Sequence, residues 1–279
     1  MIQNLVGAMY LLRLTIYVVY WIYLEHWLNR DKGAGRALKI GLWIFVGITL
    51  LTTTVQYFFY PNLRNLQYLG WDPHLDRAFG VFFDTAIAGA VYGLIFLDTE
   101  DLFVRLAYFV FLIFSFSRNA YLALSASVAY LFFKQKQHLK IAAFILVLLV
   151  LAFIAPKPAG EGAKLTRTFT VMARLDDYKE GLGLFLKRPV LGYGYDRLRY
   201  VRNIPVSNSG ATFSSSYLTI LASSGLLGFS AFAWFVVSIW KKYKNKRMLL
   251  IFVGLASLFD NIFLHPFILL LFFSFLSDR

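Results

Sequence analysis

The sequence predicts an all-α polytopic integral membrane protein, a bundle of about nine spanning helices with one large outer loop. The first observation is composition, because 59% of the 279 residues are hydrophobic and only 15% are charged, whereas soluble domains keep about a quarter of their residues charged. The second is a series of apolar runs near the 20 or so residues that cross a bilayer. The third is the clustering of Lys and Arg in short loops between the runs.

The apolar runs together make up a single transmembrane domain over residues 1–279. The last run, 248–277, contains a His265-Pro266 step that predicts a helical hairpin. The first run is too long for a cleavable signal peptide and lacks a basic leader. In chain order, the runs preceding the hairpin lie near residues 5–28, 38–59, 80–97, 102–117, 119–133, 139–155 and 215–240.

The distribution of basic residues orients the chain. Arg30, Lys32, Arg36 and Lys39 lie between the first two runs, which predicts that this loop is inside and the N-terminus outside. Alternation then puts the C-terminus inside. The same alternation makes 98–104, 134–140 and 241–247 inner loops, and 60–79, 117–119 and 156–214 outer ones.

The large outer loop, 156–214, contains ten Lys and Arg against five Asp and Glu. Within it Leu175, Tyr178 and Leu182 recur at helical spacing, which predicts an amphipathic helix over about 167–187 on the membrane surface. Pro189 ends this helix. Topology does not require basic residues on this side, although a long loop can carry them across.

The formal charge of +13 does not indicate nucleic-acid binding, because no basic amphipathic helix, zinc spacing or stacking module accompanies it. The chain has no cysteine and only four scattered histidines. Disulfides and cysteine nucleophiles are therefore excluded, and no metal-ligand spacing is present. No cofactor is expected.

The outer basic residues suggest an anion site. Arginine binds phosphate oxygens in a bidentate manner and stays charged at any working pH. Contact with lipid headgroups is the simpler alternative, but Arg118 lies between two closely spaced runs, at the membrane edge, where a charge tends to be functional. The outer arginines at or near span ends are Arg64, Arg77, Arg118, Arg174, Arg188, Arg197, Arg199 and Arg202.

Four acidic or basic groups near the outer face could take part in chemistry. Asp72 precedes a proline and initiates a turn, whereas His74 has the ordinary pKa of a general base. Asp84, at the third run, and Asp260, in the last one, are expected either to pair with an arginine or to accept a proton.

Several stretches resemble one family, the O-antigen ligase and Wzy-type polymerase superfamily. "SFSRNAYLALSAS" resembles its Ser-Arg-small motif at the head of a membrane helix, and "MARLDDYKEGLGLFLKRPVLGYGYDRL" resembles its outer-loop pattern. "SSSYLTILASSGLLGFSAF" resembles the span that follows, and "GWDPHLDRAFGVFFD" an earlier outer segment. The resemblance covers roughly residues 60–240.

The resemblance implies a GT-C-like helical fold and an inverting, metal-independent glycosyltransferase in the bacterial cytoplasmic (inner) membrane, with its active site on the outer face. It implies an undecaprenyl pyrophosphate-linked glycan donor and an acceptor hydroxyl on a glycan or a lipid anchor, with membrane lipid as the surrounding partner. By motif, Arg118 and Arg174 match functional arginines, with Arg77 next. The residues expected to bind substrate are Arg188, Arg197, Arg199, Tyr217 and Ser214.

The chain departs from the family at one chemical position. Many ligases carry a His-Asn pair where Ser214 and Ser215 stand here. A serine is no general base at neutral pH, so the substitution favours a polymerase or a divergent member. The base stays open among Asp72, His74, Asp84, Asp176 and Asp177.

The predicted spans are also fewer than in most members, and the missing ones would precede Met1. Either the family core suffices, or the reading frame is shortened. The rival functions are a transporter or flippase for a lipid-linked or anionic substrate and a purely structural membrane protein. A transporter predicts internal repeats and ionisable residues at the bilayer midplane, whereas the polar residues here concentrate at the outer face.

Overall fold

The computed structural model describes residues 2–60, 62, 74, 76–155, 168–195, 197–204 and 212–278, and within them the secondary structure is entirely helical. Each predicted apolar run forms a helix, and the amphipathic segment forms α7. The α-helices are α1 (Ile2–Arg30), α2 (Ala34–Phe59), α3 (Thr85–Asp98), α4 (Leu102–Phe114), α5 (Arg118–Lys134), α6 (His138–Ile154), α7 (Phe169–Lys187), α8 (Leu198–Val201), α9 (Ser216–Lys242), α10 (Arg247–Phe259) and α11 (Pro266–Ser277). Short 3-10 helices occupy Gly80–Phe82 and Lys244–Lys246.

The helices differ in their ability to cross a bilayer. Three of the described helices are long and apolar enough to cross a bilayer. They cover Gly7–Arg30, Ala34–Phe59 and Ser216–Lys242. Others are apolar but short; α3, for example, has 14 residues, about 21 Å at 1.5 Å per residue. The model thus supports a membrane-embedded helical protein, and the count of nine spans stays a prediction.

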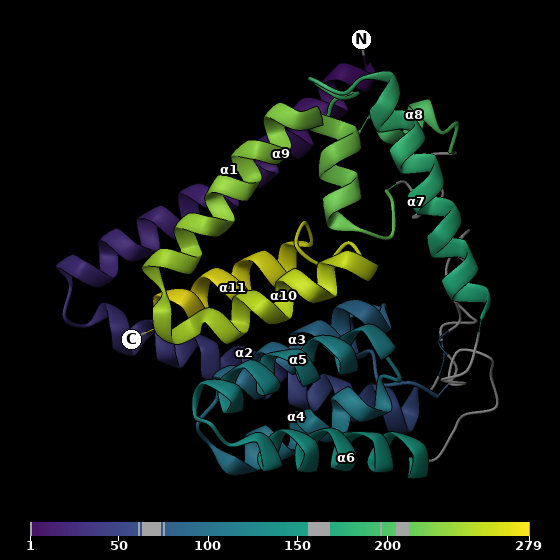
Figure 1. The fold of residues 1–279 in the computed structure, drawn as a ribbon. Helices are drawn as coiled ribbons and strands as arrows, with labels where there is room; N and C mark the ends of the chain where they lie inside the picture. Colours follow the sequence, from purple (N-terminus) through teal and green to yellow (C-terminus); the bar gives the residue numbers. More distant parts are fainter. Residues whose placement is uncertain are drawn as a thin grey trace.

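The short helix α3 lies at the centre of the molecule, and α6 lies at its edge (Figure 1). α3 is buried along almost its whole length and packs against α4, α5, α10 and α11. The fully buried Tyr92 of α3 shares a hydrogen bond of 2.9 Å with Thr53 of α2. The long helices α1 and α9 lie along the outside of this centre, where their apolar side chains remain exposed, as expected for helices in lipid.

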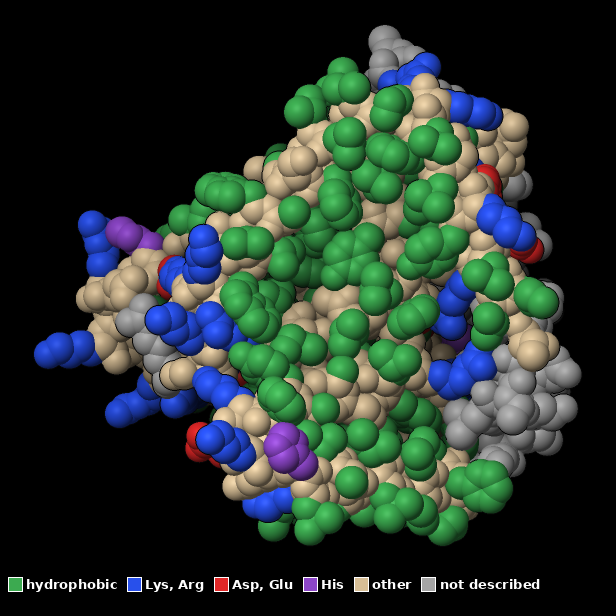
Figure 2. All heavy atoms as spheres, in the orientation of Figure 1, with side chains coloured by type: hydrophobic (Ala, Val, Ile, Leu, Met, Phe, Trp, Pro, Cys, Tyr) green, Lys and Arg blue, Asp and Glu red, His purple; other side chains and the backbone are tan. Residues whose placement is uncertain are grey.

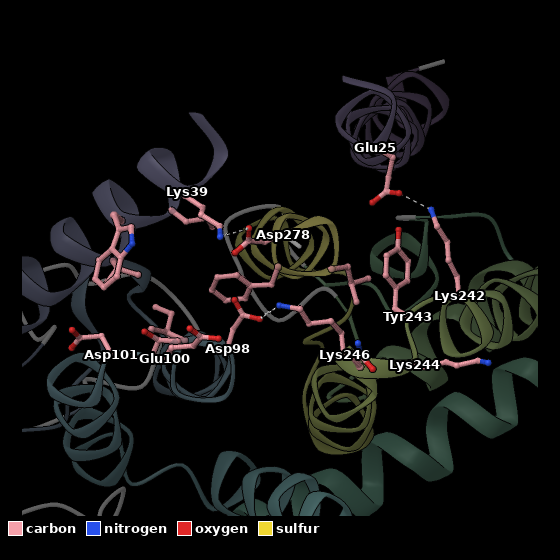
Figure 3. Close-up of a pocket in the computed structure, with 18 residues that line it drawn as sticks. Glu25, Lys39, Asp98, Glu100, Asp101, Lys242, Tyr243, Lys244, Lys246 and Asp278 are labelled. Carbon is pink, nitrogen blue, oxygen red and sulfur yellow. Dashed lines mark hydrogen bonds and ion pairs between the residues drawn. The ribbon is translucent and has the colours of Figure 1, made fainter. Parts of the chain in front are cut away.

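The charged residues gather at two opposite ends. Figure 2 shows a broad apolar band between basic groups on the left, at the junctions of α1 with α2 and of α9 with α10, and basic groups along the right edge. The left end unites the segments that the charge pattern assigns to the inside. There the side chains of Lys242 and Glu25 lie 2.8 Å apart, and Lys246 and Asp98 2.6 Å apart, around a cavity of about 900 Å³ (Figure 3).

α9 is broken at Gly225, whose φ of 62° and ψ of −162° are not helical. The segment after α7 pairs with the exposed backbone of this break. The amides of Tyr193 and Gly194 donate to the carbonyls of Ala222 and Ser223, at 3.1 and 2.7 Å. The amides of Leu226 and Leu227, in turn, donate to the carbonyls of Pro189 and Val190, at 2.8 and 3.3 Å.

We call this four-bond pairing between 189–194 and 222–227 the backbone clamp. It depends on glycine at two places. A Cβ at Gly225 would lie 2.3 Å from the carbonyl oxygen of Val190, and a Cβ at Gly192, where φ is +64°, 2.5 Å from the carbonyl carbon of Ser223. The "PVLGYG" stretch of the outer-loop motif therefore acts here as a partner for a broken helix, satisfying groups that would otherwise lack hydrogen bonds.

Substituting Gly225→Ala should destabilise the protein by more than the roughly 1–2 kcal/mol that left-handed backbone costs an L-residue, because the methyl group also overlaps the clamp. Gly183→Ala in α7 is the matched control, since a Cβ there meets nothing within 4 Å and alanine favours a helix by about 1 kcal/mol. Thermal unfolding in nanodiscs checks both. Equal melting temperatures for the two variants would contradict the clamp.

Candidate functional site

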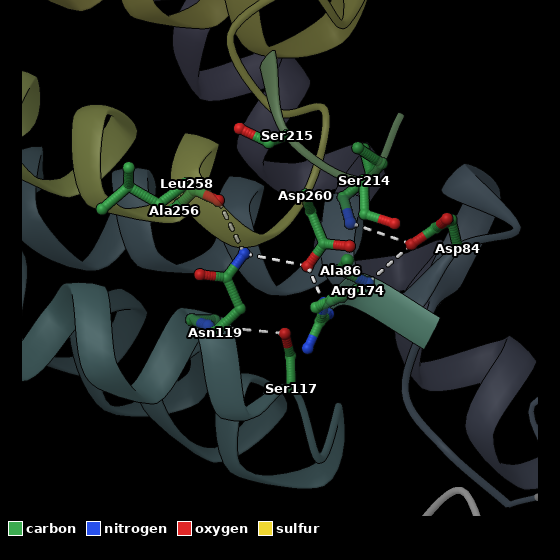
Figure 4. A network of polar contacts seen from close by, with 12 residues as sticks. Asp84, Ala86, Ser117, Asn119, Arg174, Ser214, Ser215, Ala256, Leu258 and Asp260 are labelled. Carbon is green, nitrogen blue, oxygen red and sulfur yellow. Dashed lines mark hydrogen bonds and ion pairs between the residues drawn. The ribbon is translucent and has the colours of Figure 1, made fainter. Parts of the chain in front are cut away.

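The end of the molecule opposite the 900 Å³ cavity brings together polar residues from α5, α7 and the turn between α10 and α11. Arg174 Nη2 of α7 donates to Asp260 Oδ2 at 3.1 Å. Asn119 Nδ2 of α5 donates to the same oxygen at 2.9 Å and to the carbonyl of Ala256 at 2.8 Å. Figure 4 shows the Asp260 carboxylate pointing toward both donors, with Ser214 and Asp84 nearby.

Arg118 is the first residue of α5 and precedes Asn119 directly. Ser117 caps this helix by accepting a hydrogen bond from the amide of Ala120 at 3.4 Å. The Arg118 guanidinium lies close enough to Arg174 for the two positive charges to repel. Two guanidinium groups therefore lie close together at this end, and Asp260 pairs with one of them.

Asp260 lies outside both neighbouring helices, and only 22% of its side chain is exposed. Burial raises the pKa of Asp260 to about 6, against the lowering effect of Arg174 and with a further increase from Asp84. In the same turn, burial lowers the pKa of His265 to about 4, which Asp84 opposes and Arg13 reinforces. The turn 260–265 thus holds two titratable groups within electrostatic reach of Asp84.

Other contacts fix α7 over this turn. The Tyr178 hydroxyl donates to the carbonyl of Leu258 at 2.5 Å. Asp177 Oδ2 accepts hydrogen bonds from the amide and hydroxyl of Ser214, at 3.0 and 2.5 Å. Arg202 joins the same network, 3.1 Å from Asp177 and 2.9 Å from Glu180. These bonds hold Arg174 in place through its own helix.

Arg77 and Asp84 are each held by backbone groups. Arg77 is almost fully buried, and its Nε donates to the carbonyl of Ser115 at 2.9 Å, just beyond the end of α4. Asp84 precedes α3 instead of lying inside a span, and its Oδ1 accepts from the amides of Ala86 and Ile87 at 2.6 and 3.1 Å. Asp84 remains exposed; the functional roles of both residues stay predictions.

Three more of the predicted residues have partners other than Arg118 and Arg174. Asp176 is exposed and lies 3.7 Å from Lys179. Arg188 lies over the ring of Tyr193, 4.8 Å from its centroid. The Tyr217 hydroxyl donates to the carbonyl of Gly254 at 2.9 Å, which joins α9 to α10.

The other predicted residues have varied surroundings. Arg197 is exposed, and Arg199 lines a small cavity beside α1. The His74 ring lies 6.0 Å from that of Phe79. Asp72 falls outside the described residues.

Sequence reasoning missed Asn119, although it directly follows the arginine of the Ser-Arg motif. It anticipated pairing of Asp260 with an arginine but could not identify Arg174 as the partner, 86 positions away. Among the described residues, no group of three or more His, Asp or Glu side chains could hold a metal ion.

The apolar helices define a class, that of helical integral membrane proteins. The comparison with known families is more specific. Residues 103–233, from α4 into α9, match the family model of O-antigen ligase. This match, which includes Arg118 and Arg174, supports membership of the O-antigen ligase family and confirms the predicted resemblance. No curated protein matches the chain significantly.

The raised pKa of Asp260 predicts a pH dependence of stability. Because its folded-state pKa, about 6, exceeds the ordinary value of 3.8, its favourable contribution is full below about pH 4 and is lost as pH rises through 6. The Asp260→Asn side chain stays neutral at every pH, so this variant does not lose stability as the pH rises. The variant should therefore gain stability relative to the parent by about 2–3 kcal/mol between pH 4 and 8. Melting temperatures at both pH values test this, and a constant difference would contradict it.

Proposed function

We propose that the protein transfers a glycan from an undecaprenyl pyrophosphate-linked donor to an acceptor hydroxyl, on the outer face of the bacterial cytoplasmic membrane. The proximity of Arg118 and Arg174, with Arg174 held by Asp260, carries this proposal. The match to O-antigen ligase over 103–233 supports the reaction class. A lipid-linked donor suits a site at the end of an apolar bundle, because its hydrocarbon chain stays in the bilayer.

The chemistry follows from the charge of the leaving group. When the bond from the anomeric carbon to the pyrophosphate oxygen breaks, negative charge develops on that oxygen. Two preorganised guanidinium groups stabilise this charge more in the transition state than in the ground state, which lowers the barrier. We propose that they supply the positive charge without a metal ion, and that direct attack by the acceptor oxygen inverts the anomeric centre.

Asp260 and Asn119 have a positioning role in this scheme. Asp260 holds Arg174 at 3.1 Å, and Asn119 fixes Asp260 and the end of α10 through its two hydrogen bonds. An arginine held in this way needs little reorganisation when the donor binds. One carboxylate also limits the repulsion between the two arginines before an anion arrives.

For activation of the acceptor we propose Asp84. Among the predicted bases, it is exposed and within electrostatic reach of Asp260 and His265. Asp177, in contrast, is already engaged by Ser214 and Arg202. Ser214, at the position of the ligase histidine, binds Asp177 rather than replacing the base.

The same scheme assigns sides to the membrane. The basic segments around the 900 Å³ cavity lie in the cytoplasm, and the arginine site lies outside. In this scheme the apolar helices cross or enter the bilayer, with the exposed apolar side chains of α1, α4, α6 and α9 facing lipid.

Arg118→Ala and Arg174→Ala should each lower transfer by about 10²-fold or more, as removal of one transition-state donor does. Lysine in either place should restore only part of the rate, because a point charge loses the bidentate geometry. Lys179→Ala is the matched control, since Lys179 lies on α7 with 80% of its side chain exposed. The measurement is transfer of radiolabelled glycan from polyprenyl-linked donors in nanodiscs.

The same assay separates the two branches of the family reaction. Products of increasing length identify a polymerase, and a single transfer to an added anchor identifies a ligase. If Arg174→Ala were as active as Lys179→Ala, that result would contradict the assignment of Arg174 to the site.

Asp84→Asn tests the proposed base apart from the helix cap. Asparagine caps helices about as well as aspartate, so the melting temperature should change little. The rate of transfer should fall by about 10²-fold, the usual contribution of general-base catalysis, while the donor KM stays near that of the parent. An unchanged rate would exclude Asp84 as the base.

A further inference from the structure

A second, smaller cavity lies between α1, α8 and the turn that follows α10. Its volume is about 70 Å³. Its lining consists of Tyr10, Arg13, Tyr195, Leu198, Arg199, Thr212, Asn261 and Leu264.

The lining is rich in hydrogen-bond donors. It contains two guanidinium groups, two phenol hydroxyls, one primary amide and one threonine hydroxyl. No acidic residue is among the described side chains that line it, whereas five carboxylates line the 900 Å³ cavity at the other end. A small cavity lined by several hydrogen-bond donors, Arg13 among them, suits an anion.

Arg13 is the unusual member of this lining because it lies within a membrane helix. It is 17 positions from Arg30, the basic end of α1, or about 26 Å at 1.5 Å per residue. With Arg30 at the inner interface, Arg13 falls just inside the opposite edge of a hydrocarbon core about 30 Å thick. An ionisable residue at that depth calls for a partner or a ligand.

In the described structure, Arg13 has a partner for only part of its guanidinium group. Its guanidinium lies over the ring of Tyr10, 4.6 Å from the centroid. Its Nε is buried and has no hydrogen-bond partner in the described structure. Burial of such a donor is costly unless something accepts its hydrogen bond.

The cavity shares a wall with the Arg118–Arg174 site. Asn261, which lines the cavity, donates to Thr212 Oγ1 at 3.2 Å and accepts from the Ser216 hydroxyl at 3.0 Å. The preceding residue, Asp260, binds Arg174. Two consecutive residues of one turn thus belong to two cationic sites.

The size of the cavity limits its ligand. At about 30 Å³ per water molecule, 70 Å³ is the space of about two waters. The cavity therefore suits one small anionic group and is too small for a sugar ring.

We propose that this cavity binds one phosphate group of a lipid at the outer edge of the membrane. Resting on the proposed function, we assign that lipid as the glycan acceptor, itself carried on a polyprenyl pyrophosphate. Its glycan then extends across the shared turn, so that its hydroxyl meets the anomeric carbon of the donor held by Arg118 and Arg174. A phospholipid headgroup presents the same phosphate chemistry and is the alternative source.

The test is native mass spectrometry of the full chain in a detergent without phosphate, with undecaprenyl pyrophosphate or phosphatidylglycerol added. The parent should bind two copies of undecaprenyl pyrophosphate. Arg13→Gln should bind one, with at least a tenfold loss of affinity for the second. Arg30→Gln, the same substitution at the other end of α1, is the matched control and should bind two.

Further variants keep the outcomes separate. Arg199→Gln should repeat the loss if Arg13→Gln fails to fold, and Arg174→Ala should remove the other copy while leaving the Arg13-dependent one. A failure of the proposed function, seen as Arg174→Ala with normal transfer, is therefore distinct from a failure of this inference.

If Arg13→Gln loses binding of phosphatidylglycerol but still binds two copies of undecaprenyl pyrophosphate, the cavity is a site for lipid phosphate but not for the glycan acceptor. That result would overturn the acceptor assignment. Identical binding of both lipids by Arg13→Gln, Arg199→Gln and Arg30→Gln would overturn the site.

Discussion

The ion pair between Arg174 and Asp260 is the contact on which the arrangement of the candidate site depends. A largely buried carboxylate is unfavourable unless donors surround it, and Asp260 receives its donors from α7 and α5 while lying on the turn after α10. One side chain thus fixes three segments that are distant in sequence. It also places a negative charge beside two arginines that lie close enough to repel each other.

The backbone clamp provides the second constraint, and it acts without charge. The break at Gly225 exposes backbone groups of α9, and the segment after α7 satisfies four of them. This fixes the C-terminal end of α7, while the bonds between Asp177 and Ser214 fix its middle. The glycine-containing segment 189–194 thus holds the end of α7, and α7 in turn positions Arg174.

The proposed chemistry uses this rigidity in two ways. The arginine pair is prepared for the charge of a leaving pyrophosphate, and the cavity beside Arg13 is prepared for another phosphate. Because Asp260 and Asn261 are consecutive, any movement of their turn alters both sites together. Donor and acceptor binding are therefore expected to influence each other through this turn, since each ligand must accommodate the same backbone position.

The sequence by itself determined the class of fold and named several residues of the candidate site. Apolar runs of suitable length dictated the helices, because a bilayer requires backbone hydrogen bonds to close within each segment. Basic residues predicted which helix ends share a side, and the Ser-Arg and glycine motifs pointed to Arg118 and Arg174. These signals are local, since each depends on residues that are neighbours in the chain.

Tertiary structure alone decided which polar groups meet. Nothing local indicates that Asp260 binds Arg174, that Arg77 donates to the carbonyl of Ser115, or that Arg13 faces a cavity with Arg199. These outcomes depend on how short helices pack and where α9 breaks, and burial then decides whether each charge needs a protein partner or a ligand. Pairing across such distances follows from the desolvation of charged groups, which a linear pattern of residue types does not record.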